Sequence, residues 1–238
     1  EGIVPDVVTF ISILKACGST GAVEKSKVIH EEIVSRGLLE KDIMLGNALV
    51  DMYAKCGILD KAEQLLEELP VRNTISWSSL ISGYTQQGRS HEALNCFDQM
   101  QCEGLSPNVV IFTCILKACG DGAMIGKGIE IHEEVISRGL LTKDVVLGTS
   151  LVDMYAKCGI ITKAQEVFDN LAVKNMVSWS TLLAGYAQQG QVQEVSSCFE
   201  RMRNEGIFPD DVIFTCILKA FGSEGWIHKG KSVHAEIL

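Results

Sequence analysis

The chain has 238 residues, of which 47% are apolar and 21% charged, with 21 basic and 30 acidic residues giving a net charge of −9. This apolar fraction suffices for a continuous core and argues against disorder. No apolar run approaches the roughly 18 residues that a membrane helix needs, and the acidic balance argues against a nucleic-acid binder with the usual basic footprint.

The chain starts at Glu1 and stops at Leu238 inside an apolar helical pattern, so we expect it to be a piece of a longer protein. Nine cysteines are present, and none forms a Cys-x-x-Cys motif. Eight of them form four pairs whose members lie 102 residues apart: Cys17/Cys119, Cys56/Cys158, Cys96/Cys198 and Cys114/Cys216. Repeated positions of this kind indicate packed structural thiols in a reducing compartment.

Apolar residues recur with the helical period throughout the chain. Leu45, Leu49, Met52, Tyr53 and Cys56 would lie on one helical face. The same holds for two later stripes: Trp77, Leu80, Ile81 and Tyr84, then Ala93, Phe97 and Met100. Pro5, Pro107 and Pro209 fall between the predicted hairpins, where we expect no helix.

Seven glycines each follow one helical run and precede another, at spacings of 39, 31, 32, 39, 31 and 32 residues: Gly18, Gly57, Gly88, Gly120, Gly159, Gly190 and Gly222. A glycine there suits the left-handed residue that ends a helix. The pattern therefore predicts about seven helix-turn-helix hairpins and requires no strand.

A longer period of 102 residues contains the hairpins. LVDMYAKCG occurs at residues 49–57 and 151–159, and FTCILKA occurs at residues 112–118 and 214–220, with a diverged copy at 10–16. A single hairpin cannot bury its apolar face, whereas stacked hairpins can. We predict an all-α fold, an α-solenoid in which first helices form an inner layer and second helices an outer one.

These motifs resemble the pentatricopeptide repeat (PPR) family, specifically its PLS subclass, which cycles through repeat types of 35 (P), 36 (L) and 31 (S) residues. GNALVDMYAKCG is similar to an S repeat, SWSSLISGYTQQG to a P repeat and FTCILKACGDGAM to an L repeat. The resemblance implies a right-handed superhelix with these parts: the end of a preceding repeat at 1–6, L at 7–42, S at 43–73, P at 74–108, L at 109–144, S at 145–175, P at 176–210 and a truncated L at 211–238.

The resemblance implies binding of single-stranded RNA, with one base per repeat and no enzymatic activity or cofactor. In the family, the second residue of each repeat sandwiches the base, and here these residues are Val8, Met44, Ile75, Val110, Val146, Val177 and Val212. The fifth and last residues contact the base edge, as short polar side chains can do with a splayed base.

Carried over, the base-reading pairs are Asn47/Asn73 for a pyrimidine, Ser78/Asn108 and Thr149/Asn175 for adenine, Ser180/Asp210 for guanine and Thr113/Asp144 for a guanine-like choice. L repeats follow the family's rule poorly, the Ile11/Asp42 pair does not fit it, and Thr215 has no last partner in the chain. The implied register is 5′-N-(C/U)-A-(G?)-A-G-N-3′.

Each of these assignments has a structural alternative. Asn47 and Thr149 are residue types that also cap helix N-termini, and the last residues of the repeats are ordinary turn residues. Lys55 and Lys157 would contact phosphates, or would be solvated lysines that favour a helix C-terminus. Trp77 and Trp179 would stack on bases or, as their place on the apolar stripe favours, pack in the core.

His30, His132 and His234 each begin an H-x-E triplet, half of the zinc deaminase signature. The P-C-x-x-C half is absent, so we interpret these histidines as structural, and we predict no catalytic residue and no metal site.

By resemblance, the chain would specify C-to-U editing sites in transcripts of a chloroplast or mitochondrion in a plant. Its partners would be single-stranded RNA, MORF-type editing cofactor proteins, or a deaminase-like DYW domain beyond Leu238. Two further hypotheses are end-to-end self-association through the cut last hairpin, near Val233 and Ile237, and, as the alternative function, a protein-binding helical scaffold.

Overall fold

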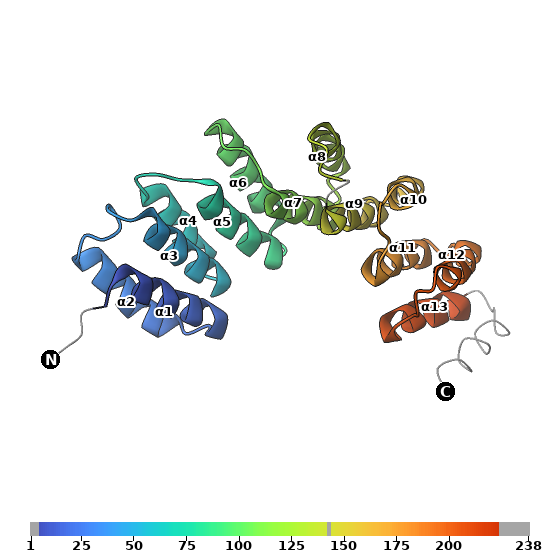
Figure 1. The fold of residues 1–238 in the computed structure, drawn as a ribbon, viewed down its shortest axis with the longest axis horizontal. Coiled ribbons are helices and arrows are strands. Elements are labelled where there is room, and N and C mark those ends of the chain that lie inside the picture. Colours follow the sequence, from blue (N-terminus) through green and yellow to red (C-terminus); the bar gives the residue numbers. More distant parts are fainter. Residues whose placement is uncertain (1–4, 142–143, 224–238) are drawn as a thin grey trace. The chain divides into compact units, whose positions relative to one another are not determined.

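The computed structural model describes residues 5–141 and 144–223, and these residues form thirteen α-helices and no strand (Figure 1). The helices are α1 (Val7–Thr20), α2 (Val23–Ser35), α3 (Ile43–Lys55), α4 (Leu59–Glu68), α5 (Thr74–Gln86), α6 (Ser90–Cys102), α7 (Val109–Asp121), α8 (Ile125–Ser137), α9 (Val145–Lys157), α10 (Ile161–Asp169), α11 (Met176–Gln188), α12 (Val192–Asn204) and α13 (Asp211–Ser223). They make six complete hairpins and the first helix of a seventh, so the predicted all-α fold is confirmed.

Three expectations fall outside the described residues. They are the second helix of the seventh hairpin, the exposure of Val233 and Ile237 at its end, and the third H-x-E triplet at His234. Among the described residues, no helix has the length and apolar character to cross a membrane.

The chain divides into two compact units, residues 1–118 and 119–238, with the boundary inside α7. In the first unit, α1 packs on α3 and α3 packs on α5, so these first helices lie side by side (Figure 1). In the second unit, α9 packs on α11 and α11 packs on α13. The second helices α4 and α10 each pack against the first helix of their own hairpin and of the next. This stacking of hairpins is an α-solenoid.

The core is built from the predicted apolar stripes. Leu45, Leu49, Leu80 and Phe97 are fully buried. Cys96 and Cys198 are buried as well, and burial raises the pKa of each thiol to about 12. All nine cysteines are free, and Cys102, which has no copy at the 102-residue spacing, is exposed. The thiols thus pack as small apolar groups, which confirms the structural interpretation.

The hairpins have two kinds of turn instead of the single kind that we expected. In one kind the predicted glycine ends the first helix, and in the other it lies inside that helix. Gly57 and Gly88 follow first helices in the left-handed conformation, with φ of 78° and 70°, as predicted. Gly18, Gly120 and Gly222 instead lie inside α1, α7 and α13, so their assignment as helix ends is wrong. The left-handed residue that follows α1 is Gly21, and the non-glycine Ala123 takes the equivalent place after α7.

A neighbouring helix approaches Gly120 closely, since a Cβ atom there would lie 3.2 Å from the Cα of Met154. A Cβ atom on Gly18 would lie 3.4 Å from the Cα of Met52, which is ordinary van der Waals contact. A glycine needed for close packing and a glycine needed for a turn look alike in a sequence, which explains the error.

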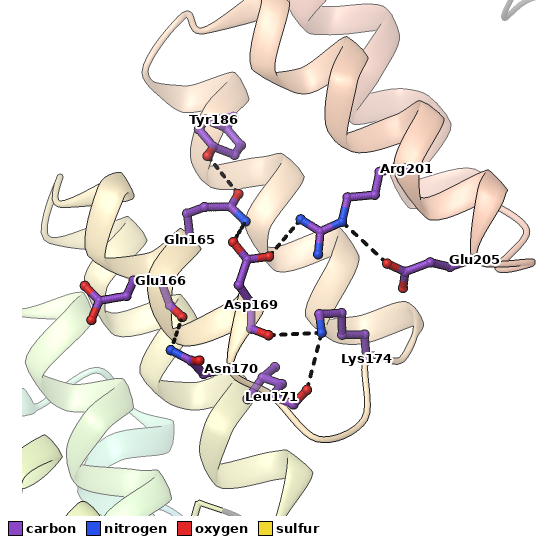
Figure 2. Close-up of polar contacts among 9 residues, drawn as sticks. All are labelled: Gln165, Glu166, Asp169, Asn170, Leu171, Lys174, Tyr186, Arg201 and Glu205. Atoms are coloured by element: carbon purple, nitrogen blue, oxygen red, sulfur yellow. Dashed lines mark hydrogen bonds and ion pairs between the residues drawn. The ribbon is translucent and has the colours of Figure 1, made fainter.

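Polar side chains tie α10, α11 and α12 together in the second unit (Figure 2). The Tyr186 hydroxyl donates to Gln165 over 2.8 Å, and the Gln165 amide donates to Asp169 over 2.7 Å. Asp169 also pairs with Arg201 at 2.7 Å, and Lys174 donates to the main-chain carbonyl of Asp169 at 3.2 Å. The network joins neighbouring hairpins on the side of the second helices.

Candidate nucleic-acid interface

The second residue of every first helix is apolar and exposed to solvent. Between 55 and 70% of its surface is accessible: Val8, Met44, Ile75, Val110, Val146, Val177 and Val212. The next apolar positions on the same helices, such as Leu45 and Leu147, are fully buried. Since packing among the described residues does not require an apolar residue there, its recurrence on every first helix indicates a binding surface.

The fifth residues of the first helices lie one turn further along, at Asn47, Ser78, Thr113, Thr149 and Ser180. Asn47 and Thr149 are therefore inside α3 and α9, and the alternative that they cap these helices is wrong. The Thr149 hydroxyl donates to the Val145 carbonyl over 2.8 Å, and the Ser180 hydroxyl donates to the Val177 carbonyl over 2.9 Å. Each hydroxyl proton is thus engaged, and the oxygen is left as an acceptor.

Asn47 is different from its copy Thr149. It is only 7% exposed, and its Oδ1 atom is buried with no hydrogen-bond partner in the described residues. A buried acceptor without a partner is costly, on the order of 1–3 kcal/mol. A ligand or a water molecule would have to supply the missing donor.

The residues predicted at the last position of each repeat are N-caps of the following first helix. The Asn73 Oδ1 accepts from the amide of Ser76 at 3.0 Å, and the Asp210 Oδ1 accepts from the amide of Ile213 at 2.9 Å. The same arrangement occurs at the other last positions, Asp42, Asn108, Asp144 and Asn175. These residues therefore have the structural role that their residue type favours.

Capping uses only one of the two polar atoms of each side chain. The second atom, a donating Nδ2 in asparagine and an accepting Oδ2 in aspartate, has no partner in the described part of the chain. The cap holds the side chain in one orientation, so the free atom has a fixed direction and a chemistry that depends on residue type. A cap and a base contact are compatible.

The fifth and last residues of three pairs come from helices that pack together. Asn47 is on α3 and Asn73 caps α5, Thr149 is on α9 and Asn175 caps α11, and Ser180 is on α11 and Asp210 caps α13. For Ser78 and Asn108, contact between α5 and α7 is shown by Ser82 and Cys114, whose side chains lie 3.3 Å apart. Thr113 belongs to the first unit and Asp144 to the second, so the structure describes the position of each residue only within its own unit.

Lys55 and Lys157 are the last residues of α3 and α9, and both are paired with carboxylates. The Lys55 Nζ lies 2.7 Å from Asp51, and the Lys157 Nζ lies 2.7 Å from Asp121 and 2.8 Å from Asp153. Partial burial lowers the pKa of Lys157, but the hydrogen bonds to these carboxylates outweigh it and raise the pKa overall. A contact between these lysines and an RNA phosphate stays a prediction. Without RNA, the charge of each lysine is already neutralised by its carboxylate partner.

The other candidates pack within the structure. Trp77 is 4% exposed and donates its indole N–H to Glu103 over 2.8 Å, and Trp179 is fully buried against Phe168, so the core interpretation is confirmed. The Nδ1 atoms of His30 and His132 each lie 2.9 Å from a tyrosine hydroxyl of the next hairpin, which gives these histidines a structural place. Among the residues described, no cluster of potential metal ligands occurs.

Two family models match this chain. That of the PPR repeat family matches residues 72–121 and 174–223, and that of the PPR repeat matches residues 8–38, 47–73 and 149–176. Together these matches take in well over half of the sequence.

Curated relatives come from Arabidopsis thaliana. One chloroplastic pentatricopeptide repeat-containing protein is 38% identical over 214 residues, which is 90% of this chain and 34% of the relative. Another is 38% identical over 231 residues, or 96% and 31% of the two chains, and a mitochondrial one is 34% identical over 229 residues, or 96% and 41%. The chain thus spans about a third to two fifths of the length of these relatives.

Solved structures share the fold. The pentatricopeptide repeat protein PPR10, crystallised in complex with an 18-nt psaJ RNA element, matches with a TM-score of 0.76 at 18% identity, over 98% of this chain and 35% of that chain. The PPR domain of the Arabidopsis thaliana protein-only RNase P 1, in complex with tRNA, matches with a TM-score of 0.57 at 16% identity, over 72% and 94% of the two chains.

Proposed function

We propose that this chain, which belongs to the pentatricopeptide repeat family, binds single-stranded RNA with one base held at each first helix. The observation that carries the proposal is the exposed apolar residue at the second position of all seven first helices. Relatives of the same fold have been crystallised with RNA, which agrees with this choice of ligand.

The spacing of the first helices suits a base. Packed helices lie about 8–10 Å apart, and a flat base between two aliphatic side chains needs van der Waals contact on both faces. Val177 on α11 and Val212 on α13 can supply these two contacts, because the two helices pack together and both side chains are solvent-exposed. Bases unstacked from one another and separated by side chains are the usual target of sequence-specific RNA binding.

The base edge would then face the fifth and last residues. In the proposed register the free atoms decide the base: an Asn Nδ2 donates to the N1 acceptor of adenine or to a pyrimidine, whereas an Asp Oδ2 accepts from the N1–H and N2–H₂ of guanine. The pairs named above then give the register 5′-N-(C/U)-A-(G?)-A-G-N-3′. In this proposal, successive segments of the chain are repeats of the L, S and P types.

In this proposal the chain is the recognition part of a longer organelle protein and has no catalytic role. The relatives named for the chloroplast and the mitochondrion favour those compartments. The PLS arrangement of repeat types favours specification of C-to-U editing sites, with the deamination supplied by a DYW domain in the same protein or by a partner, and MORF-type proteins as cofactors.

The test is titration of labelled 12-nucleotide RNAs that contain 5′-(C/U)-A-N-A-G, its complement or a scrambled sequence, at physiological salt. We expect the matched RNA to bind most tightly. We also expect Val177→Ser to weaken it, and Val28→Ser, an equally exposed change on the second helix α2, to have no effect. Equal affinity for the three RNAs would contradict base recognition, and no RNA binding would favour a protein-binding scaffold.

A further inference from the structure

Three lysines on first helices are exposed, and their side chains have no ion pair or hydrogen bond in the described residues. They are Lys15, Lys117 and Lys219, which lie 102 residues apart. Each is the ninth residue of its helix, α1, α7 or α13. Many other basic residues are paired, such as Arg36 with Glu32 and Arg89 with Glu92.

These lysines share a helical face with the exposed apolar residues. Lys15 follows Val8 by seven residues, as Lys117 follows Val110 and Lys219 follows Val212. Seven residues make almost two full turns, so the two side chains point in nearly the same direction, about 10 Å apart along the helix. A flexible lysine chain therefore borders the surface where a base would lie in the proposed function.

The other first helices carry no free cation at the ninth position. In α3 and α9 this residue is Asp51 or Asp153, and each pairs with the lysine four residues later. In α5 and α11 it is Ser82 or Ala184. On this face of the first helices, unpaired positive charge is therefore confined to α1, α7 and α13 within the described structure.

We infer that Lys15, Lys117 and Lys219 bind the phosphate backbone of the RNA, an inference that rests on the proposed function. An ammonium group without a carboxylate partner binds a phosphate without first breaking an ion pair, whereas Lys55 and Lys157 must release Asp51 and Asp153. The helices with these lysines begin the hairpins that resemble L repeats, whose fifth and last residues follow the family's rule poorly, as Ile11 and Asp42 do. They would hold the strand, and the intervening hairpins would read it.

The decisive measurement is the salt dependence of RNA affinity. Each phosphate neutralised on a single strand contributes about 0.7 to the slope of log affinity against log salt. We expect the triple variant Lys15→Gln, Lys117→Gln and Lys219→Gln to lose about 2 of that slope. It should bind matched and scrambled RNA more weakly by the same factor, on the order of 10- to 50-fold near 150 mM salt.

The matched control is Lys25→Gln, Lys61→Gln and Lys163→Gln, which removes the same charge from the second helices α2, α4 and α10 and should leave the slope unchanged. The single variant Lys117→Gln repeats the test with one surface change. Its slope of log affinity against log salt should fall by about 0.7. If the unaltered chain binds RNA and both triple variants have its slope, the inference is wrong. If the unaltered chain binds no RNA, the proposed function is wrong instead.

Discussion

At the scale of the residue, the proposed function would give the capping side chains a part in both helix stability and base recognition. Asp210 accepts an amide hydrogen at the start of α13 through Oδ1 and leaves Oδ2 free, and Asn175 does the same at α11 with a free Nδ2. Asparagine and aspartate are about equally good N-caps. Exchanging one for the other therefore changes the free atom while the helix start is preserved.

Asp210→Asn should move the preferred base at its position from guanine to adenine, because an acceptor becomes a donor. The expected change in relative affinity is about 1–3 kcal/mol, the usual value for base-edge hydrogen bonds. Competition between RNAs that differ only at this base measures it, and Asp210→Ala, which removes the cap, is the comparison. Equal loss of affinity for both bases with Asp210→Asn would show that the side chain does not contact the base.

These polar residues could be named from the sequence, but their geometry could not. Their positions in each repeat followed from the resemblance, but it was the last residues, not Asn47 and Thr149, that proved to be caps. The pairing of Lys55 with Asp51 was missed, although the spacing of four residues on a helix indicates it. The free lysine in each FTCILKA motif was missed too, and its recurrence at 102 residues was the available signal.

At the scale of the element, glycines set how closely the helices stack. A Cβ atom on Gly83 in α5 would lie 2.7 Å from Leu59 and 3.0 Å from the Cβ of Ala54. Gly185 in α11 meets Ile161 and Ala156 in the same way. The helical period and the buried stripes were predictable from local pattern, whereas this close approach depends on the neighbouring hairpin and was not.

Gly83→Ala should destabilise the fold by about 1–3 kcal/mol, the usual cost of overpacking. Gly126→Ala is the control, since nothing lies within 4 Å of a Cβ there, and the higher helix propensity of alanine should leave stability unchanged or raise it by up to about 1 kcal/mol. Urea unfolding followed by circular dichroism measures both. A neutral Gly83→Ala would mean that α3 and α5 can separate without loss.

Two histidines link second helices to the next hairpin and make stability depend on pH. Burial lowers the pKa of His30 on α2, and the nearby Lys61 lowers it further, against smaller opposing effects of Glu68 and Glu31. His132 on α8 is lowered by burial and by Lys163 in the same way. The folded state thus prefers the neutral imidazole, hydrogen-bonded to Tyr53 or Tyr155.

Below the unfolded histidine pKa of about 6.5, the unfolded chain takes up protons before the folded chain does, so stability should fall as the pH drops from 7.5 towards 5.5. Most carboxylates remain ionised over this range. Urea midpoints at several pH values measure the effect, and the His30→Gln, His132→Gln variant should have a flatter dependence. An unchanged slope in that variant would assign the effect to other groups.

At the scale of the molecule, the 102-residue period repeats the same arrangement of hairpins, with different polar residues at equivalent positions. Hairpins in a solenoid contact only their neighbours, so Asn47 in the first unit and Asp210 in the second belong to separate sites. The period was predictable by self-comparison, but the division at residues 118 and 119 was not. The net charge of −9 does not describe the first helices by themselves, since acidic residues such as Glu31 and Glu133 lie on second helices.

Independent sites predict additive changes in recognition. Asn47→Thr copies the residue found in α9, where the Thr149 hydroxyl donates to a helix carbonyl. This change should replace the pyrimidine preference by adenine and remove the buried Oδ1 that has no partner. Combined with Asp210→Asn, it should give a chain that prefers adenine at both positions, with a free-energy change equal to the sum of the two single changes within about 0.5 kcal/mol.

The measurement is a double-mutant cycle. It compares the affinities of the unaltered chain, both single variants and the double variant for four RNAs, in which the two bases are exchanged singly and together. Each variant should prefer the RNA that its own residues specify, and the bases at unaltered positions should keep their preference. A double variant that deviates from the sum by more than 1 kcal/mol would mean that the two hairpins communicate. Recognition would then depend on how the units are arranged, and the bases could not be assigned hairpin by hairpin.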